Sequence, residues 1–130
     1  MEDLWLCRFS SYYRCMNYRD LTVWNTSMDL VTELYKMTAV FPKEEVYGLT
    51  AQMRRSAVSI PSNIAEGSRR GTKKDYRQFV LIAFGSGSEL ETQIEIVKRL
   101  GYAKENDIVE VQSRLENVMK MLNKLQQSLV

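Results

Sequence analysis

Carboxylates at helical spacing are the first residues in this chain that could perform chemistry. Glu91 and Glu95 are four residues apart, so they would share one face of a helix and could bind a divalent metal or transfer protons. The chain contains no histidine, the commonest general base and metal ligand, and no Glu-x-x-His motif. We therefore expect these acids to be solvated or paired with basic neighbours, and we predict no catalytic residue, no metal site and no cofactor.

Basic residues gather in the middle of the chain and form a second kind of candidate site. From Arg54 to Arg77 there are seven basic residues and two acids, whereas the formal net charge of the whole chain is +2. A helix-helix corner at residues 67–74 would place several of them beside the amide-rich N-terminus of the next helix, a favourable position for phosphate oxygens. A loop kept soluble by its charge would have the same composition. The predicted nucleic-acid-binding residues are Arg54, Arg55, Arg69, Arg70, Lys73, Lys74 and Arg77.

Small polar side chains form a stripe where lysine and glutamate would be expected on a solvated helix face. They would cap and cross-link helices, including a helix of another subunit, or they would bind a ligand or anion. Gly85 and Gly87 lie within a helical pattern, where each costs up to about 1 kcal/mol relative to alanine. Close approach of two backbones would explain that cost. The predicted oligomer-interface residues are Ser59, Ser62, Asn63, Glu66, Gly85, Ser86 and Glu89.

Helices must position these residues, because the chain has only two prolines and six glycines and its apolar residues recur at steps of three and four. The first expected helix runs from Arg19 to the Phe41-Pro42 pair. Its buried face is predicted to carry Leu21, Trp24, Met28, Val31, Tyr35 and Thr38. The second begins at Lys43, is kinked near Pro61 and stops at Gly67. Its predicted buried face comprises Leu49, Met53, Ala57, Ile60 and Ile64.

The third expected helix begins at Thr72, which forms a capping box with Asp75, and it stops at Gly101. The fourth begins at Asn106 or Asp107. Its apolar positions are Ile108, Val111, Leu115, Val118, Leu122 and Leu125. Four amphipathic helices with short connections predict an all-α, up-down-up-down antiparallel four-helix bundle, formed as one domain by residues 18–130.

The N-terminal segment lacks a sustained period. We predict that residues 1–17 form a poorly ordered extension, or that the sequence before Met16 lies upstream of the natural start. Cys7 and Cys15 are too far apart for a redox pair or a zinc knuckle, so we expect reduced thiols. No apolar run approaches the roughly 20 residues that cross a bilayer, and the first residues carry acids where a secretory signal is basic. We expect a cytoplasmic protein that does not bind membranes.

Several segments together resemble a known family. The chain from Tyr18 to Gln126 resembles the bacterial four-helix-bundle family encoded in intervening sequences of large-subunit (23S) rRNA genes. The segments that carry the resemblance are Phe41-Pro42-Lys43-Glu44-Glu45, then Leu49 with Gln52, Arg55 and Ser59, then Asn63-Ile64-Ala65-Glu66-Gly67, and Gly85-Ser86 followed by Glu89-Leu90. That family is similar to the accessory proteins of diversity-generating retroelements, which are basic pentameric bundles that bind nucleic acid and a reverse transcriptase. The resemblance implies a homo-oligomer, with a pentamer as the expected form.

Three hypotheses follow from the residues and the resemblance. The first is a non-enzymatic oligomer that binds RNA, DNA or a nucleoprotein partner, such as a reverse transcriptase, through the basic corner. The second is a purely structural module whose corner contacts an acidic protein. The third is an enzyme that uses Glu66, or Glu91 with Glu95, and a metal. We expect the first, and the weakly basic overall charge predicts weaker nucleic-acid binding than that of the basic relatives.

Overall fold

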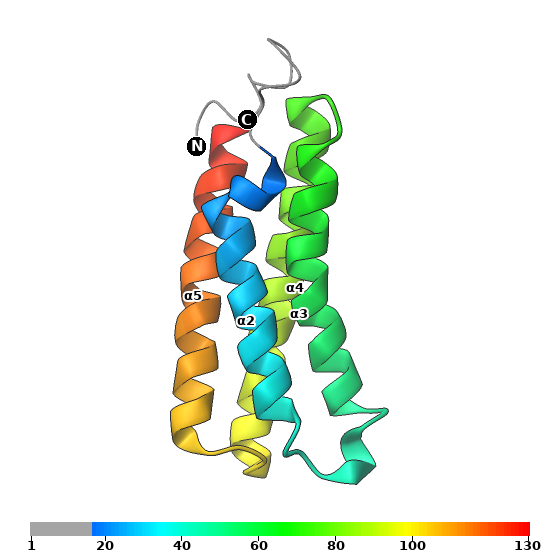
Figure 1. The fold of residues 1–130 in the computed structure, drawn as a ribbon, viewed down its shortest axis with the longest axis vertical. Coiled ribbons are helices and arrows are strands. Elements are labelled where there is room, and N and C mark those ends of the chain that lie inside the picture. The colour runs from blue at the N-terminus through cyan, green and yellow to red at the C-terminus, as the bar shows by residue number, and fades with distance from the viewer. Residues whose placement is uncertain (1–16) are drawn as a thin grey trace.

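The computed structural model describes residues 17–130 and shows four α-helices, two short 3-10 turns and no strand within that range (Figure 1). The elements are η2 (Tyr18–Asp20), α2 (Thr22–Thr38), η3 (Lys43–Glu45), α3 (Leu49–Ser68), α4 (Lys73–Leu100) and α5 (Glu105–Ser128). The helices run alternately down and up, so the predicted all-α, up-down-up-down bundle is confirmed. Cys7, Cys15 and the predicted extension lie outside the described residues, except for Asn17.

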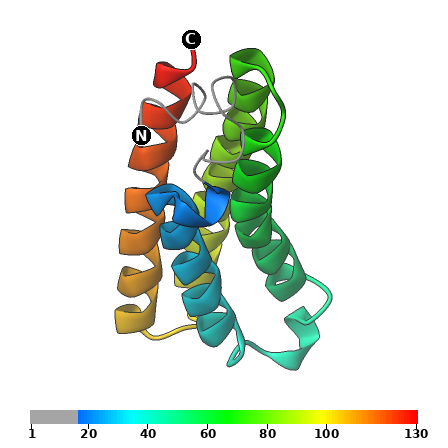
Figure 2. The same cartoon turned by 45° about the horizontal axis from the view of Figure 1, so that its top comes forward.

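Each helix packs against two neighbours around one apolar core. The contacting pairs are α2 with α3, α3 with α4, α4 with α5, and α5 with α2. The core residues that are shielded most completely come from all four helices, among them Leu30, Met53, Leu90 and Leu122, each 0% exposed. The corner between α3 and α4 and the C-terminus of α5 lie at one end of the bundle, and the other two connections lie at the opposite end (Figures 1 and 2).

The buried face of α2 differs from the predicted one. Its core ladder comprises Val23, Ser27, Leu30, Leu34, Met37 and Thr38. Trp24 and Val31 are only partly buried, while Met28 and Tyr35 are 39% and 41% exposed. The sequence carries two parallel ladders on this helix, and the predicted one lies on the side toward α3. There the guanidinium of Arg54 covers the Tyr35 ring at 4.3 Å from its centroid, so the ring stays at the surface.

The start of α3 also differs from the prediction. Lys43–Glu45 forms a single 3-10 turn, and the α-helix begins only at Leu49, after Gly48. The Glu45 carboxylate acts from outside the helix, because its Oε1 accepts a hydrogen bond from the Leu49 N–H at 3.2 Å. Of the predicted core positions, Met53, Ala57, Ile60 and Ile64 are buried, and Leu49 is only partly buried. The helix contains Pro61 and is continuous across it, and the bend expected there stays a prediction.

Two glycines lie at close helix contacts rather than in a turn. The contact at Gly67 is with an atom fixed to the backbone, whereas the contact at Gly87 is with the flexible end of Met119. Gly67 lies inside α3 rather than stopping it, and a Cβ atom there would lie 2.6 Å from Cβ of Phe79 on α4. Gly87 lies inside α4, where a Cβ atom would lie 2.2 Å from Sδ of Met119 on α5. These contacts allow α4 to approach both of its neighbours closely. At Gly85 a Cβ atom would meet nothing within 4 Å among the described residues, so close packing within the chain does not explain that glycine.

Local signals define both ends of α4 as predicted. Thr72 Oγ1 accepts a hydrogen bond from the Asp75 N–H at 3.1 Å, and Gly101 adopts the left-handed conformation at φ 69°. The start of α5 differs, because its cap is Lys104, which makes no side-chain cap bond, rather than Asn106 or Asp107. The predicted apolar positions of α5 are all buried.

The two connections at the end away from the α3–α4 corner are joined by a polar contact. Tyr102 donates its hydroxyl to Glu45 Oε2 at 2.9 Å, and its ring packs against Phe41 with centroids 5.6 Å apart. The hydrogen bond to Glu45 raises the pKa of Tyr102 above its ordinary value, because the neutral phenol is the hydrogen-bond donor. Among the described residues, no helix is both long and apolar enough to cross a bilayer.

Candidate nucleic-acid interface

The α3–α4 connection forms the basic corner, defined here as Arg69, Arg70, Lys73, Lys74 and Arg77. Its backbone is set by Gly71, whose φ of 119° is one that side-chain-bearing residues rarely adopt, and by the Thr72 cap that starts α4. Gly67 brings α3 against Phe79 just below the turn. The last turn of α3 and the first turn of α4 therefore lie together at one end of the bundle (Figure 1).

Aromatic rings hold two of the corner arginines. Arg70 lies 4.7 Å from the centroid of the Phe79 ring and donates to Glu66 Oε2 at 2.9 Å. Both partners in that ion pair are about half exposed, so water screens it and it can open at small cost. Arg69 lies 5.1 Å from the centroid of Tyr18, a residue of η2, and Arg19 lies 4.9 Å from the same ring. Cations therefore lie around two rings at this end.

The remaining corner cations differ in whether their side chains also hold the bundle together. Arg77 donates from Nε to the Gln126 carbonyl oxygen at 3.3 Å and from Nη2 to Gln126 Oε1 at 2.9 Å, which ties α4 to the end of α5. Lys74 is exposed on the first turn of α4, and Lys73 beside it is partly buried. The positive charge of Lys74 and Arg70 is thus available at the surface, while Arg77 also stabilises the bundle.

The structure separates Arg54 and Arg55 from the other predicted nucleic-acid-binding residues. Arg54 and Arg69, the C-cap of α3, are fifteen positions apart, which corresponds to about 22 Å along the helix axis. Arg54 Nε donates to Thr38 Oγ1 at 2.9 Å and Nη2 donates to the Tyr35 carbonyl oxygen at 3.3 Å, so this arginine braces α3 against α2. Arg55 is exposed on the neighbouring face. The seven predicted residues therefore form two groups rather than one surface.

The polar stripe connects α3 to α4 within one chain. Ser59 Oγ and Ser86 Oγ are 2.8 Å apart, and Asn63 Nδ2 donates to Ser59 Oγ at 2.9 Å and to the Ser59 carbonyl oxygen at 2.7 Å. Ser56, which is 3% exposed, donates to Glu89 Oε1. These bonds agree with the expectation that the small polar groups cross-link helices.

Part of the same stripe faces solvent in the single chain. Ser62 bonds only back to its own helix, at the Val58 carbonyl oxygen, while Glu66 pairs with Arg70. Gly85 and Glu89 are exposed. The predicted interface residues thus divide into an inner row, Ser59, Asn63 and Ser86, that bonds within the chain, and an exposed outer row, in which Glu89 also accepts from Ser56. Their place in a subunit interface stays a prediction.

Of the acids considered for metal chemistry, Glu66 and Glu95 are paired with cations and Glu91 is exposed. Glu95 lies 3.3 Å from Arg99 Nε and 3.8 Å from Lys98 Nζ, and all three side chains are substantially exposed. Within residues 17–130 no group of three or more acidic, histidine or cysteine side chains could hold a metal ion. The structure agrees with the expectation that these acids are solvated or paired.

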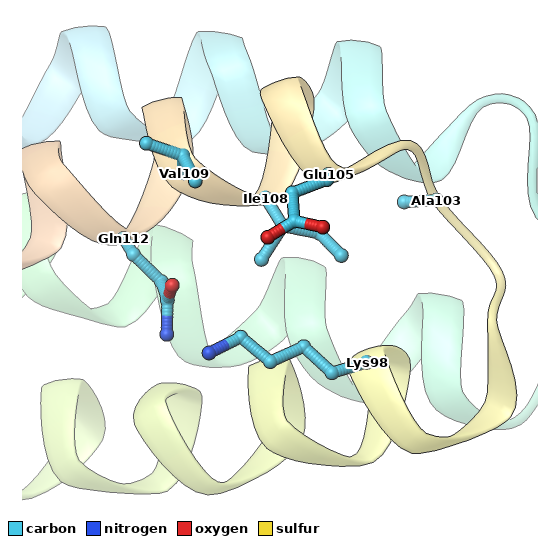
Figure 3. Close-up of a pocket in the computed structure, with 6 residues that line it drawn as sticks. All are labelled: Lys98, Ala103, Glu105, Ile108, Val109 and Gln112. Carbon is cyan, nitrogen blue, oxygen red and sulfur yellow. The ribbon is translucent and has the colours of Figure 1, made fainter.

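A cavity of about 320 Å³ lies near the α4–α5 connection, and Figure 3 shows its lining. Lys98 extends from α4 toward Gln112, and the Glu105 carboxylate lies on the first turn of α5. One cation and one anion with apolar neighbours give this cavity no preference for a charged ligand. The lining residues are Lys98, Ala103, Glu105, Ile108, Val109 and Gln112.

Sequence reasoning missed Tyr18 and Arg19 as parts of the basic end. The η2 turn carries Tyr18 onto the corner, where its ring contacts Arg69 and lies 5.3 Å from the Trp24 ring in an edge-on arrangement. Asn17 caps this turn by accepting from the Arg19 N–H at 3.0 Å. A Tyr-Arg pair before a helix gives no signal of a partner some fifty residues away, so this contact follows only from the fold.

The fold and its basic end define this chain as an antiparallel four-helix-bundle protein. Residues 19–124 match the family described as 23S rRNA-intervening sequence protein, so the chain belongs to that family, and the resemblance seen in the sequence is confirmed. A crystal structure of a protein of unknown function from the S23 ribosomal protein family of Bacteroides thetaiotaomicron VPI-5482 has the same fold, with a TM-score of 0.70 and 21% identity. The alignment covers 78% of this chain and 94% of that one. No curated protein matches this sequence.

Proposed function

We propose that this protein is a non-enzymatic, oligomeric helical bundle that binds RNA through the basic corner. The observation that carries the proposal is the clustering of Arg69, Arg70, Lys73 and Lys74 around one helix-helix turn, with Arg19 brought beside them by the Tyr18 ring. Membership of a family described by 23S rRNA intervening sequences makes RNA the first nucleic acid to test.

The corner combines three features that favour a phosphate backbone. Lys74 and Arg70 supply exposed positive charge, and the first N–H groups of α4 point to the same side of the turn. Arginine planes stacked on the Tyr18 and Phe79 rings are held in place, so less side-chain entropy is lost when they meet a phosphate or an unstacked base. Such contacts give affinity for the backbone and little sequence preference.

Assembly would compensate for the small overall charge of one chain. A formal net charge of +2 predicts weak binding by a monomer, but several corners on one oligomer bind a long RNA together and raise the effective affinity. The outer row of the stripe, Ser62, Glu66, Gly85 and Glu89, is the surface through which we expect copies to meet, in the pentamer that the family resemblance implies. A nucleoprotein partner such as a reverse transcriptase would contact the same basic end, and we expect this to take place in the cytoplasm.

Fluorescence anisotropy with labelled structured RNA, single-stranded RNA and duplex DNA tests the proposal. The test variant replaces Arg69, Arg70, Lys73 and Lys74 with alanine. The matched control replaces four exposed cations at the opposite end, which are Lys43, Lys98, Arg99 and Lys104. Both variants lose four positive charges, so a difference between them reports the position of the charge rather than its amount.

We expect the corner variant to lose at least about tenfold in RNA affinity at 50 mM salt, and the control to change by much less. Equal losses would mean that net charge alone attracts the RNA. No measurable RNA binding by the unaltered protein would leave the second hypothesis, in which the corner contacts an acidic protein. Helical circular dichroism of all three proteins checks that the fold is retained.

A further inference from the structure

A second cavity, of about 530 Å³, lies on the α2–α3 side of the bundle, between the end of α2 and the start of α3. We call it the connector pocket. Its walls are mostly apolar, and its volume lies in the range in which small-molecule sites are found. The α2–α3 connection that supplies much of its lining lies at the end of the bundle away from the basic corner (Figure 1). The lining residues are Thr38, Ala39, Phe41, Pro42, Lys43, Val46, Thr50 and Arg54.

The charged residues that line this pocket are all basic. Lys43 and Arg54 line it, and no acidic residue does. Glu45 on η3 does not neutralise this charge, because both of its carboxylate oxygens already accept hydrogen bonds. One accepts from the Leu49 N–H at 3.2 Å and the other from the Tyr102 hydroxyl at 2.9 Å. Glu44 is exposed on the same turn and does not line the cavity. The pocket therefore offers uncompensated positive charge within apolar walls.

Arg54 is held in a fixed orientation and lacks an anionic partner within the described part of the chain. It is partly buried, yet no carboxylate among residues 17–130 pairs with it. The Tyr35 ring and the bonds to Thr38 Oγ1 and the Tyr35 carbonyl oxygen fix its orientation and use two of its five N–H donors. Fully buried charges are ordinarily paired, whereas Arg54 is buried only in part and keeps access to solvent on the pocket side. The remaining donors can bind one further acceptor without a change of rotamer.

The Thr50 hydroxyl is a second polar group in the pocket that is available to a ligand. Its side chain lines the pocket, is 5% exposed, and has no hydrogen-bond partner among the described residues. It lies in the first turn of α3, where Glu45 accepts from the Leu49 N–H and the N-cap residue Gly48 adds no side-chain cap. The hydroxyl oxygen is not shielded from solvent, so it can bond to water or to a ligand in the pocket. The unpartnered hydroxyl and the first turn of α3 thus border the same cavity as Arg54.

We propose that the connector pocket binds a small organic anion with an apolar body. A carboxylate bonds to Arg54 and to the Thr50 hydroxyl, and the apolar part lies against Phe41, Pro42 and Val46. Lys43 supplies a second positive charge at the edge. This site is distinct from the basic corner, and it gives Arg54 a role that nucleic-acid binding does not require.

The dye 1-anilinonaphthalene-8-sulfonate is a suitable probe, because it is an apolar anion whose fluorescence rises on binding. The test variant is Arg54→Gln, which keeps a hydrogen-bonding side chain but removes the charge. The matched control is Arg55→Gln, which removes the same charge from the next position of α3, outside the pocket. A further variant, Val46→Glu, changes a residue that is 51% exposed and places an acid in the pocket without disturbing the core.

We expect Arg54→Gln to raise the dissociation constant of the dye about tenfold or more, the loss expected for one hydrogen bond to a charged group. Val46→Glu should raise the dissociation constant of the dye by a similar factor, and Arg55→Gln should change it by no more than about twofold. The neutral analogue N-phenyl-1-naphthylamine should bind more weakly and should not distinguish Arg54→Gln from the unaltered protein. Octanoate should displace the dye, and the same concentration of inorganic phosphate should not.

Several results would overturn the proposal. They are no dye binding by the unaltered protein, equal effects of Arg54→Gln and Arg55→Gln, and no effect of Val46→Glu in a variant with unchanged helical content. Displacement of the dye by phosphate as readily as by octanoate would assign the site to inorganic phosphate instead. None of these measurements involves RNA, so their outcome is independent of the proposed function.

Discussion

Replacing Gly67 with alanine should destabilise the bundle, although alanine is the better helix former. A Cβ atom at this position would lie 2.6 Å from Cβ of Phe79 and 3.3 Å from the carbonyl oxygen of Tyr76. Carbon atoms in ordinary contact are about 3.5–4.0 Å apart, so α3 and α4 would have to separate by roughly 1 Å. Because Cβ of Phe79 is fixed to its backbone, a change of rotamer cannot relieve the overlap.

The expected magnitude follows from two opposing effects. Overpacking of a close helix contact costs about 1–3 kcal/mol, and the helix propensity of alanine returns about 1 kcal/mol. We therefore expect a net loss of about 1 kcal/mol in the free energy of unfolding. The matched substitution Gly85→Ala has no overlap within 4 Å and should gain up to about 1 kcal/mol from propensity alone. The two variants should thus differ by about 2 kcal/mol with opposite signs.

Urea denaturation followed by circular dichroism measures this difference. All proteins are compared at one fixed concentration, because association makes stability depend on concentration. If Gly67→Ala were as stable as the unaltered protein or more so, the close approach of α3 and α4 at the corner would be refuted. A loss of stability in Gly85→Ala that appears together with a smaller mass in solution would instead place Gly85 in a subunit contact.

Three further predictions concern the stripe, the far end and the α4 cap. Ser62→Leu, in the exposed outer row, should lower the mass measured by light scattering if the stripe forms a subunit interface, and an unaltered oligomer would remove that assignment. Tyr102→Phe should flatten the loss of stability at alkaline pH. The raised pKa of Tyr102 means that its hydrogen bond to Glu45 stabilises the fold below the unfolded pKa of about 10, and that this contribution is lost as pH rises through the folded value. An equally steep alkaline loss in the variant would contradict this. Thr72→Ala should cost about 1 kcal/mol in urea melts, because it removes the cap of α4, and a cost below about 0.3 kcal/mol would show that the cap is dispensable.

The sequence predicted the features that depend on local chemistry. The Thr72 cap, the left-handed Gly101 and the apolar ladder of α5 need only neighbouring residues, and the structure has all of them. The bundle topology follows because four amphipathic helices with short connections have few other ways to bury their apolar faces.

Features that depend on distant neighbours were not predictable in the same way. The helix Thr22–Thr38 carries two apolar ladders, and only the packing of α3 and α5 against it selects the one with Leu30 and Leu34. The sequence predicts a helix stop at Gly67, because a glycine near a helix end often is one, whereas its neighbour Phe79 on α4 shows that close packing requires this glycine. The separation of Arg54 from the basic corner likewise follows from the length of α3, which a count of charges does not consider.

The dependence of RNA affinity on salt concentration tests the central claim most directly. For the unaltered protein, a plot of log affinity against log salt should be linear, with a slope of about −0.7 for each single-strand phosphate that is neutralised. The variant lacking Arg69, Arg70, Lys73 and Lys74 should have a slope that is shallower by about 2 to 3, while the variant lacking four cations at the opposite end keeps the original slope. Identical slopes for all three proteins would show that the basic corner does not contact the RNA.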